Sequence, residues 1–249
     1  PGYSSVVLSA ANTNSTQFNN AQRIVRDSKG NLYFAYHKTY SSYLQIFVAK
    51  SCDNGDTWSN TGEPIKEISG YNQKYPSLAI DSNDHLHIVW EGEDKDSGGN
   101  SQIMYCEYDG NLWREVDVVD SSSNDQHAPA IAIDKNNELH VVWFEGTTSQ
   151  IKYAKGPLWT TPALISSNLG SYEQKYPNIA VDNENNLHVI WQGKATSYTS
   201  YDTVWYATQT IGWSTPVCLQ TSGQNTDPTL RWSRYPASNG ITSRVEYVF

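Results

Sequence analysis

The chain has 249 residues, of which 12% are aromatic and 17% charged, and its net charge is −9 at neutral pH. That charge, without any cluster of lysine and arginine, argues against a nucleic-acid partner. No apolar run reaches the length of a membrane span, and the first residues form no signal peptide, so we expect any such segment to lie outside this sequence.

Four segments share one pattern, in which a strand, a polar turn and a second strand follow one another. The turn begins with an aspartate, and a third β-rich run, a turn with a tryptophan and a fourth short run follow. The hairpins span residues 21–38, 75–92, 128–146 and 176–193, and a weaker copy spans 227–249.

A period near 50 residues connects these copies, because successive repeated prolines lie 53, 48 and 51 residues apart at Pro76, Pro129, Pro177 and Pro228. Four short antiparallel strands at this period are typical of a β-propeller blade. In the second strands, the side chains on both faces are bulky. This pattern predicts burial on both faces, as between packed blades. A two-sheet sandwich is the alternative, but it does not require the same aspartate and tryptophan to recur.

We therefore predict an all-β fold, a β-propeller of four-stranded antiparallel blades that forms one domain over residues 1–249. The beginning of the chain, from Gly2, matches the segment from Gly212 before a fourth strand, and the chain ends at a second strand. This pattern predicts about five blades, the fifth built from both termini. The alternative is a fragment of a six- or seven-bladed ring.

The turn SCDNGDTW, residues 51–58, is the most specific motif. It resembles the Asp-box, or BNR repeat, of the sialidase-like β-propeller superfamily, and degenerate versions (DGNLW, KGPLW, IGW) stand in the other repeats. The resemblance implies a structural turn on the face opposite the usual binding site. Hydrogen bonds from the turn to its aspartate and a positive φ at its glycine fit that role. The matching positions are Ser51, Asp53, Gly55, Thr57 and Trp58.

Histidines recur on the second strand at His87, His140 and His188, with Tyr33 at the matching position. One histidine per repeat between apolar neighbours predicts packing against a neighbouring blade rather than metal ligation. The three cysteines are widely spaced and form no Cys-x-x-Cys pair. We therefore expect no metal and no cofactor.

In a propeller, the loops between blades and the loops after each second strand surround one mouth of the central channel, so their polar residues are the candidate ligand-binding groups. We interpret Glu91 and Glu145, just after the second strands, as similar positions in adjacent blades. They are candidate catalytic residues if the protein is an enzyme, and solvated rim residues otherwise. The other candidate binding residues are Lys74, Tyr75, His127, Lys175, Tyr176 and Asp227.

Carboxylates, cations and tyrosines around a shallow mouth suit a glycan or polysaccharide, because aromatic rings stack on sugar C–H groups and polar side chains bind hydroxyls. We expect a non-enzymatic carbohydrate-binding or scaffold module of a secreted or surface protein, with other domains of a longer chain as further partners. The alternative is a sialidase-like glycoside hydrolase acting on glycan chains, with Glu91 and Glu145 flanking the scissile bond. The superfamily's Arg-Ile-Pro signature is missing, since no arginine stands two residues before the repeated prolines.

Overall fold

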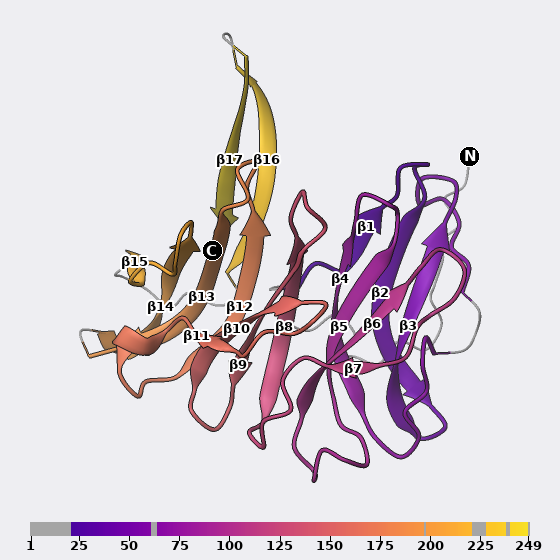
Figure 1. Cartoon of the computed structure of the whole chain (residues 1–249), viewed down its shortest axis with the longest axis horizontal. Helices are drawn as coiled ribbons and strands as arrows, with labels where there is room; N and C mark the ends of the chain where they lie inside the picture. The colour runs from indigo at the N-terminus through magenta and orange to yellow at the C-terminus, as the bar shows by residue number, and fades with distance from the viewer. Residues whose placement is uncertain (1–20, 61–63, 197, 221–227, 238–239, 249) are drawn as a thin grey trace.

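The structure, a computed structural model, describes residues 21–60, 64–196, 198–220, 228–237 and 240–248, and their regular structure is almost entirely β-strand (Figure 1). The strands form three four-stranded sheets, one three-stranded sheet and one two-stranded sheet, all antiparallel. We name the first four blade 1 (β1–β3), blade 2 (β4–β7), blade 3 (β8–β11) and blade 4 (β12–β15). Their bounds are β1 Ile24–Arg26, β2 Leu32–Tyr40, β3 Tyr43–Ser51, β4 Gln73–Ile80, β5 Leu86–Gly92, β6 Gln102–Tyr108, β7 Asp117–Val118, β8 Gln126–Ile133, β9 Leu139–Glu145, β10 Gln150–Gly156, β11 Ala163–Leu164, a 3₁₀ turn Ser167–Leu169, β12 Gln174–Val181, β13 Leu187–Ala195, β14 Tyr198–Gln209, β15 Val217–Gln220, β16 Thr229–Ala237 and β17 Gly240–Val248.

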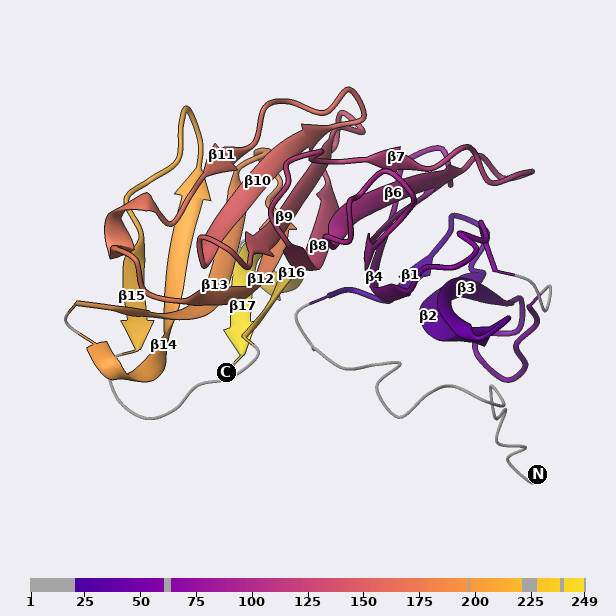
Figure 2. The same ribbon diagram turned by 90° about the horizontal axis from the view of Figure 1, so that it is seen from below.

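Each sheet is one copy of the sequence repeat, with its strands in chain order from the inside outward. Figure 2 shows the sheets side by side along an arc, with β7, β11 and β15 on its outer side. Innermost strands of neighbouring sheets also contact one another, as β4 contacts β8 and β8 contacts β12. The predicted β-propeller of four-stranded blades is therefore confirmed.

The repeated aspartates close the hairpin between the first and second strands. In blade 2, Asp81 Oδ1 accepts hydrogen bonds from the backbone N–H groups of Asn83 and His85, both at 2.8 Å. Asp134 and Asp182 make the same pair of bonds in blades 3 and 4. One carboxylate thus satisfies two turn donors in each blade.

The same turns also connect neighbouring blades. The fourth residue of each turn has a positive φ and is Asp84, Asn137 or Asn185, residue types that tolerate this backbone region. Their side-chain oxygens accept backbone N–H bonds from the preceding blade's turn, donated by Ser28, Ser82 and Lys135 at 2.7, 3.1 and 3.3 Å. The aspartate and asparagine side chains thus set the spacing of adjacent blades at this end.

The second strands are buried on both faces, as their bulky alternation predicts. Every residue of β5 is buried, and Trp90, Trp143 and Trp191 are fully buried between sheets. The apolar clusters extend from one blade into the next; one joins Val89 of blade 2 to Val141 of blade 3. Because apolar burial stabilises by roughly 25 cal/mol per Å², the core of the molecule is the set of blade interfaces.

The innermost strands β1, β4, β8 and β12 line a central cavity of about 610 Å³. The β16–β17 hairpin packs beside blade 4 through β12 and begins a fifth sheet. The predicted N-terminal strand of a fifth blade lies outside the described residues. Within the described part of the chain, no helix has the length and hydropathy to cross a membrane.

Candidate functional site

Each blade has two ends. We call the end where β4, β8 and β12 begin and β5, β9 and β13 finish the mouth end, and the opposite end, with the aspartate hairpins, the turn end. The long loops from Glu93 to Ser101 and from Asp120 to Asp125 lie at the mouth end. This is where the sequence predicts ligand-binding residues.

A β-bulge shapes the mouth end of three inner strands. Pairing shifts register between Lys74 and Ser77 in β4, and at the corresponding positions of β8 and β12. The bulged residues before the repeated prolines, Tyr75, Ala128 and Tyr176, have φ near +50°. Such backbone is costly for a residue with a side chain and clusters at functional sites. The bulges turn the backbone N–H groups of Tyr75 and Ala128 toward the preceding blade.

Glu91, the penultimate residue of β5, is the centre of this end. The residue is 4% exposed, and its carboxylate lies between blades 2 and 3. Oε1 is 3.4 Å from the Lys74 ammonium, and Oε2 is 3.2 Å from His127 Nδ1 and accepts the Ala128 N–H at 3.4 Å. A buried carboxylate is retained where cations and donors compensate for lost hydration, and all three groups do so here.

His127 is the exposed partner of that carboxylate. Its side chain is 30% exposed, and its ring packs on Phe144 with centroids 5.0 Å apart. Burial alone would lower the His127 pKa, but the hydrogen bond and charge of Glu91 outweigh burial and raise it. The pair therefore favours an imidazolium held by a carboxylate, a group that can donate a proton near neutral pH.

His37 of blade 1 takes the place of Glu91 as the acceptor of a backbone N–H from the next blade, but its pKa is lowered rather than raised like that of His127. Its Nδ1 accepts the Tyr75 N–H at 3.2 Å, as Glu91 accepts the Ala128 N–H. Burial, together with the nearby charges of Arg23 and Lys74, lowers the His37 pKa to about 4. His37 is thus neutral, and its proton is on Nε2 because Nδ1 is an acceptor. Burial also lowers the pKa of Arg23 to about 10.

The strand position that Glu91 occupies is present in every blade, but the residue at that position differs from blade to blade. It lies opposite Lys74 in the strand pairing, and the residues opposite the matching positions of β8 and β12 are Phe144 and Gln192. His37 takes this place in blade 1. The Phe144 ring meets Tyr176 of blade 4 edge-on at 5.9 Å. From blade 1 to blade 4, this position therefore holds an imidazole, a carboxylate, an aromatic ring and an amide.

The interpretation of Glu91 and Glu145 as similar positions is wrong. Glu145 pairs with Gln126, whereas the residue that pairs as Glu91 does is Phe144. Because successive side chains of a strand point to opposite faces, the one-residue offset separates the two carboxylates by face. Glu145 is 2% exposed, accepts a 2.5 Å bond from the Thr148 hydroxyl and lies 3.8 Å from Lys152 Nζ.

Lys175 and Tyr176 form a second group, in blade 4. The Lys175 ammonium lies 3.0 Å from Glu173 and 3.5 Å from Asp202, and 5.8 Å from the centre of the Tyr176 ring. Burial lowers the Lys175 pKa, but the two acids outweigh burial, so the pKa is raised. Gln192 also donates to Asp202, at 3.1 Å.

The structure thus brings Lys74, Tyr75, Glu91 and His127 into one cluster, and Phe144 connects it to Tyr176. Asp227 lies outside the described residues. Arg23, His37 and Asp202 belong to the mouth end but were not among the sequence candidates. The repeat itself places His37 at this position, because Tyr36-His37 matches Trp90-Glu91 after the aromatic residue.

The turn of residues 51–58 lies at the turn end, since Ser51 pairs with Leu32 at the start of β2. Asp53 accepts bonds from Ser51 Oγ and from the Thr57 N–H, each at 2.8 Å, and also from the Thr57 hydroxyl. Its hydrogen bonds, first that of the Thr57 side chain, lower the Asp53 pKa to about 2. Trp58 Nε1 donates to Gly55 O at 3.1 Å. The carboxylate accepts its hydrogen bonds from within its own turn, as predicted.

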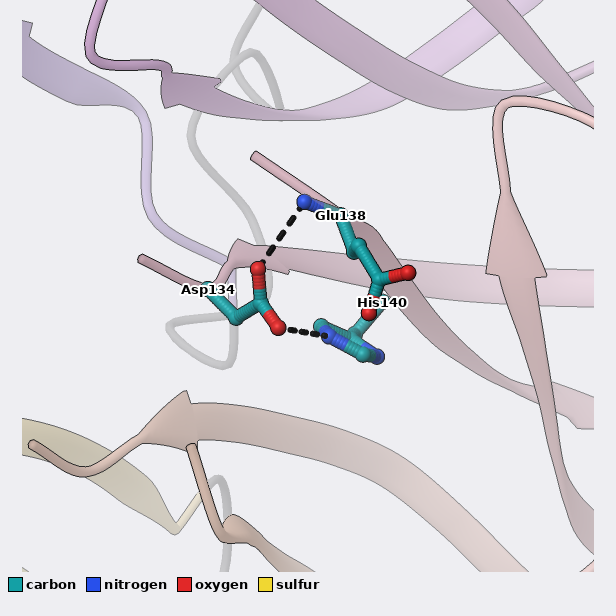
Figure 3. A group of neighbouring side chains, drawn as sticks. All are labelled: Asp134, Glu138 and His140. Atoms are coloured by element: carbon teal, nitrogen blue, oxygen red, sulfur yellow. Dashed lines mark hydrogen bonds and ion pairs between the residues drawn. The ribbon is translucent and has the colours of Figure 1, made fainter. Parts of the chain in front are cut away.

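One group of side chains in the described residues has the composition of a metal site (Figure 3). Asp134, Glu138 and His140 offer ligand atoms within 4.8 Å of one another at the turn end of blade 3. However, Asp134 Oδ1 holds the hairpin and Glu138 pairs with Lys155 at 2.6 Å.

The histidine of this group belongs to a repeated structural contact. His140 Nδ1 lies 2.9 Å from Tyr153 OH, and His87 and His188 meet Tyr105 and Tyr206 in the same way at 2.8 Å. Each tyrosine is in the histidine's own blade, so the expectation of a neighbouring-blade partner is wrong. Since the contact recurs without a matching glutamate, we assign the group a structural role.

Comparison with known proteins shows likeness of fold. No protein-family model matches the chain, and no curated protein matches it by sequence. Among solved structures, the Penicillium chrysogenum α-L-arabinanase with arabinobiose is 13% identical with a TM-score of 0.67, covering 94% of this chain and 77% of that one. The GH93 α-L-arabinofuranosidase of Fusarium graminearum with arabinobiose is 14% identical, with a TM-score of 0.68 and the same coverage.

A third solved structure, the Hadza microbial sialidase Hz136, is 13% identical with a TM-score of 0.56 and covers 90% of this chain and 55% of that one. At identities this low, similarity of structure indicates a shared fold and not a shared chemistry. The chain therefore shares the propeller architecture of these carbohydrate-active proteins.

Proposed function

We propose that the mouth end is a glycan site and that its activity is glycoside hydrolysis. The observation that carries this proposal is the buried Glu91 carboxylate, held between the Lys74 ammonium and the half-exposed His127 ring. Two of the solved structures with this fold contain arabinobiose, which supports an oligosaccharide ligand by analogy.

The chemistry of the cluster suits hydrolysis. Glycoside cleavage needs a proton for the leaving oxygen and negative charge near the developing oxocarbenium ion. His127, with its raised pKa, supplies the proton, and Glu91 orients the imidazolium and provides the charge. Water adds to the anomeric carbon as the C–O bond breaks, and the proton lost by that water restores His127. Shifted pKa values at Arg23, His37 and His127 are typical of a reactive site.

A second candidate function is glycan binding without chemistry. The observation that favours it is the separation of Glu91 and Glu145 onto opposite strand faces, so that Glu145 is not the second carboxylate that most glycosidases use. An extracellular or cell-surface location remains part of this proposal.

The test is an assay that reads retained protein and released sugar on the same panel of arabino- and β-1,3-galacto-oligosaccharides. We expect release by the wild type and a loss of about 10³-fold or more in Glu91→Gln, with binding weakened less. Glu115→Gln, at a 95% exposed carboxylate, is the matched control and should be unchanged. Retention without release would leave the binding function, and neither signal would overturn both.

A further inference from the structure

The outer part of two blade interfaces is closed by a tyrosine–tryptophan contact. Trp159 of blade 3 meets the Tyr105 ring of blade 2 edge-on, with centroids 5.1 Å apart, and Trp213 of blade 4 meets Tyr153 of blade 3 at 5.0 Å. The two tyrosines occupy the same sheet position, opposite Val89 and Val142. Each therefore fills the space beneath a tryptophan of the next blade.

The interface between blades 1 and 2 departs from this rule. Blade 1 has Val48 at the tyrosine position, opposite Ala35. A valine offers no ring to Trp113 of blade 2, which instead packs on Tyr108 of its own blade with centroids 5.1 Å apart. The space that a tyrosine fills elsewhere opens here into a cavity of about 420 Å³.

The cavity has aromatic walls and a polar rim. The rings of Tyr33, Tyr108 and Trp113 line it above Val48 and Leu86. Lys50 Nζ lies 5.2 Å from the Tyr33 ring centre. The remaining lining residues include Ser59, Asn60 and Asn111, which bring a hydroxyl and two amides. This volume lies within the roughly 300–1,000 Å³ of small-ligand sites.

We propose that this cavity binds a sugar ring and is a second carbohydrate site, distinct from the mouth. Aromatic rings stack on the C–H faces of a sugar, while amides, a hydroxyl and an ammonium bind its hydroxyls. The site lies at the turn end, because Tyr33 pairs with Lys50 and Leu86 with Tyr108 near the hairpins. A polysaccharide that reaches both ends gains avidity over either site alone. The inference stands on the cavity and does not require the proposed hydrolysis.

The decisive variant fills the cavity with the residue that the other blades use there. Val48→Tyr should place a ring beneath Trp113 without loss of folding, because blades 2 and 3 accommodate the same pair. Val217→Tyr makes the same change on an exposed strand residue and is the matched control. Asn111→Ala tests the rim without touching the core. Unfolding curves confirm that each variant folds.

Binding of arabinobiose and β-1,3-galactotriose is followed by saturation-transfer NMR and calorimetry. We expect Val48→Tyr to weaken one class of sites by at least about tenfold and Asn111→Ala to weaken it less, with Val217→Tyr unchanged. Glu91→Gln should spare this class, which separates it from the mouth. If no binding depends on Val48, or if all binding is lost in Glu91→Gln, the second site is ruled out.

Discussion

The two ends of the blades follow opposite rules. At the turn end, blades 2 to 4 repeat one aspartate, one histidine and one tyrosine with nearly constant distances. At the mouth end, a single strand position holds His37, Glu91, Phe144 or Gln192. Constancy at one end specifies how a sheet folds and where its neighbour sits, whereas variation at the other builds one asymmetric site from repeated parts.

The largest expected effect is the pH dependence of stability that the buried histidines cause. Burial lowers the pKa of His37 to about 4 and also lowers that of His87 and His140. Between pH 6.5 and 4 the unfolded chain binds protons that the folded chain excludes, so stability is present above this window and lost as pH falls through it. For His37 alone the loss is up to about 3 kcal/mol. Urea unfolding of His37→Gln from pH 7 to 4.5 should therefore show a shallower fall than the wild type.

His127 provides the control of opposite sign. Its pKa is raised in the folded protein, so its contribution is complete below pH 6.5 and lost as pH rises through the folded value. His127→Gln should therefore destabilise the protein more at pH 6 than at pH 8. Parallel pH profiles for His37→Gln and His127→Gln would contradict the assignment of a neutral ring beside Arg23 and a charged ring beside Glu91.

The second prediction concerns the constant end. Asp134→Ala leaves two hairpin N–H groups without their acceptor, which should cost about 2 kcal/mol. Glycan binding at the mouth should not change, because Asp134 lies at the opposite end. Asn136→Ala, at the exposed tip of the same turn, is expected to stay within about 0.5 kcal/mol of wild type. A weaker glycan affinity in Asp134→Ala would show that the two ends are coupled.

The same contrast explains what the sequence could predict. The hairpin aspartates act within their own turn and the strand alternation acts within its own sheet, so both are readable from local residues. The mouth depends on bulges, on contacts between blades and on one extra residue before the glycine of blade 3, which puts Phe144 at the Glu91 position and Glu145 at the Gly92 position. Pairing Glu91 with Glu145 by their following glycines missed that insertion, and only the register reveals that the faces differ.

The smallest predicted effect tests what that insertion changes. In blade 2, Trp90 Nε1 donates to Gln73 Oε1 at 2.7 Å, and Trp191 donates to Gln174 at 2.9 Å in blade 4. Both bonds depend on the glycine two residues after the tryptophan, because a Cβ on Gly92 would lie 1.9 Å from Gln73 Oε1, and one on Gly193 2.1 Å from Gln174 Oε1. In blade 3 this place belongs to Glu145, and Trp143 Nε1 has no hydrogen-bond partner among the described residues.

Gly92→Ala should therefore convert blade 2 to the state of blade 3. The added methyl displaces Gln73 and leaves the Trp90 indole N–H unpaired, at a cost of about 1 kcal/mol. Gly212→Ala, where a Cβ would meet nothing within 4 Å, is the control. Chemical unfolding gives the cost, and indole hydrogen exchange gives the cause, because the Trp90 proton should exchange faster while that of Trp191 does not. Unchanged exchange would mean that Gln73 moves with its tryptophan, and that the loss of this bond in blade 3 comes from the bulk of Glu145 rather than from the missing glycine.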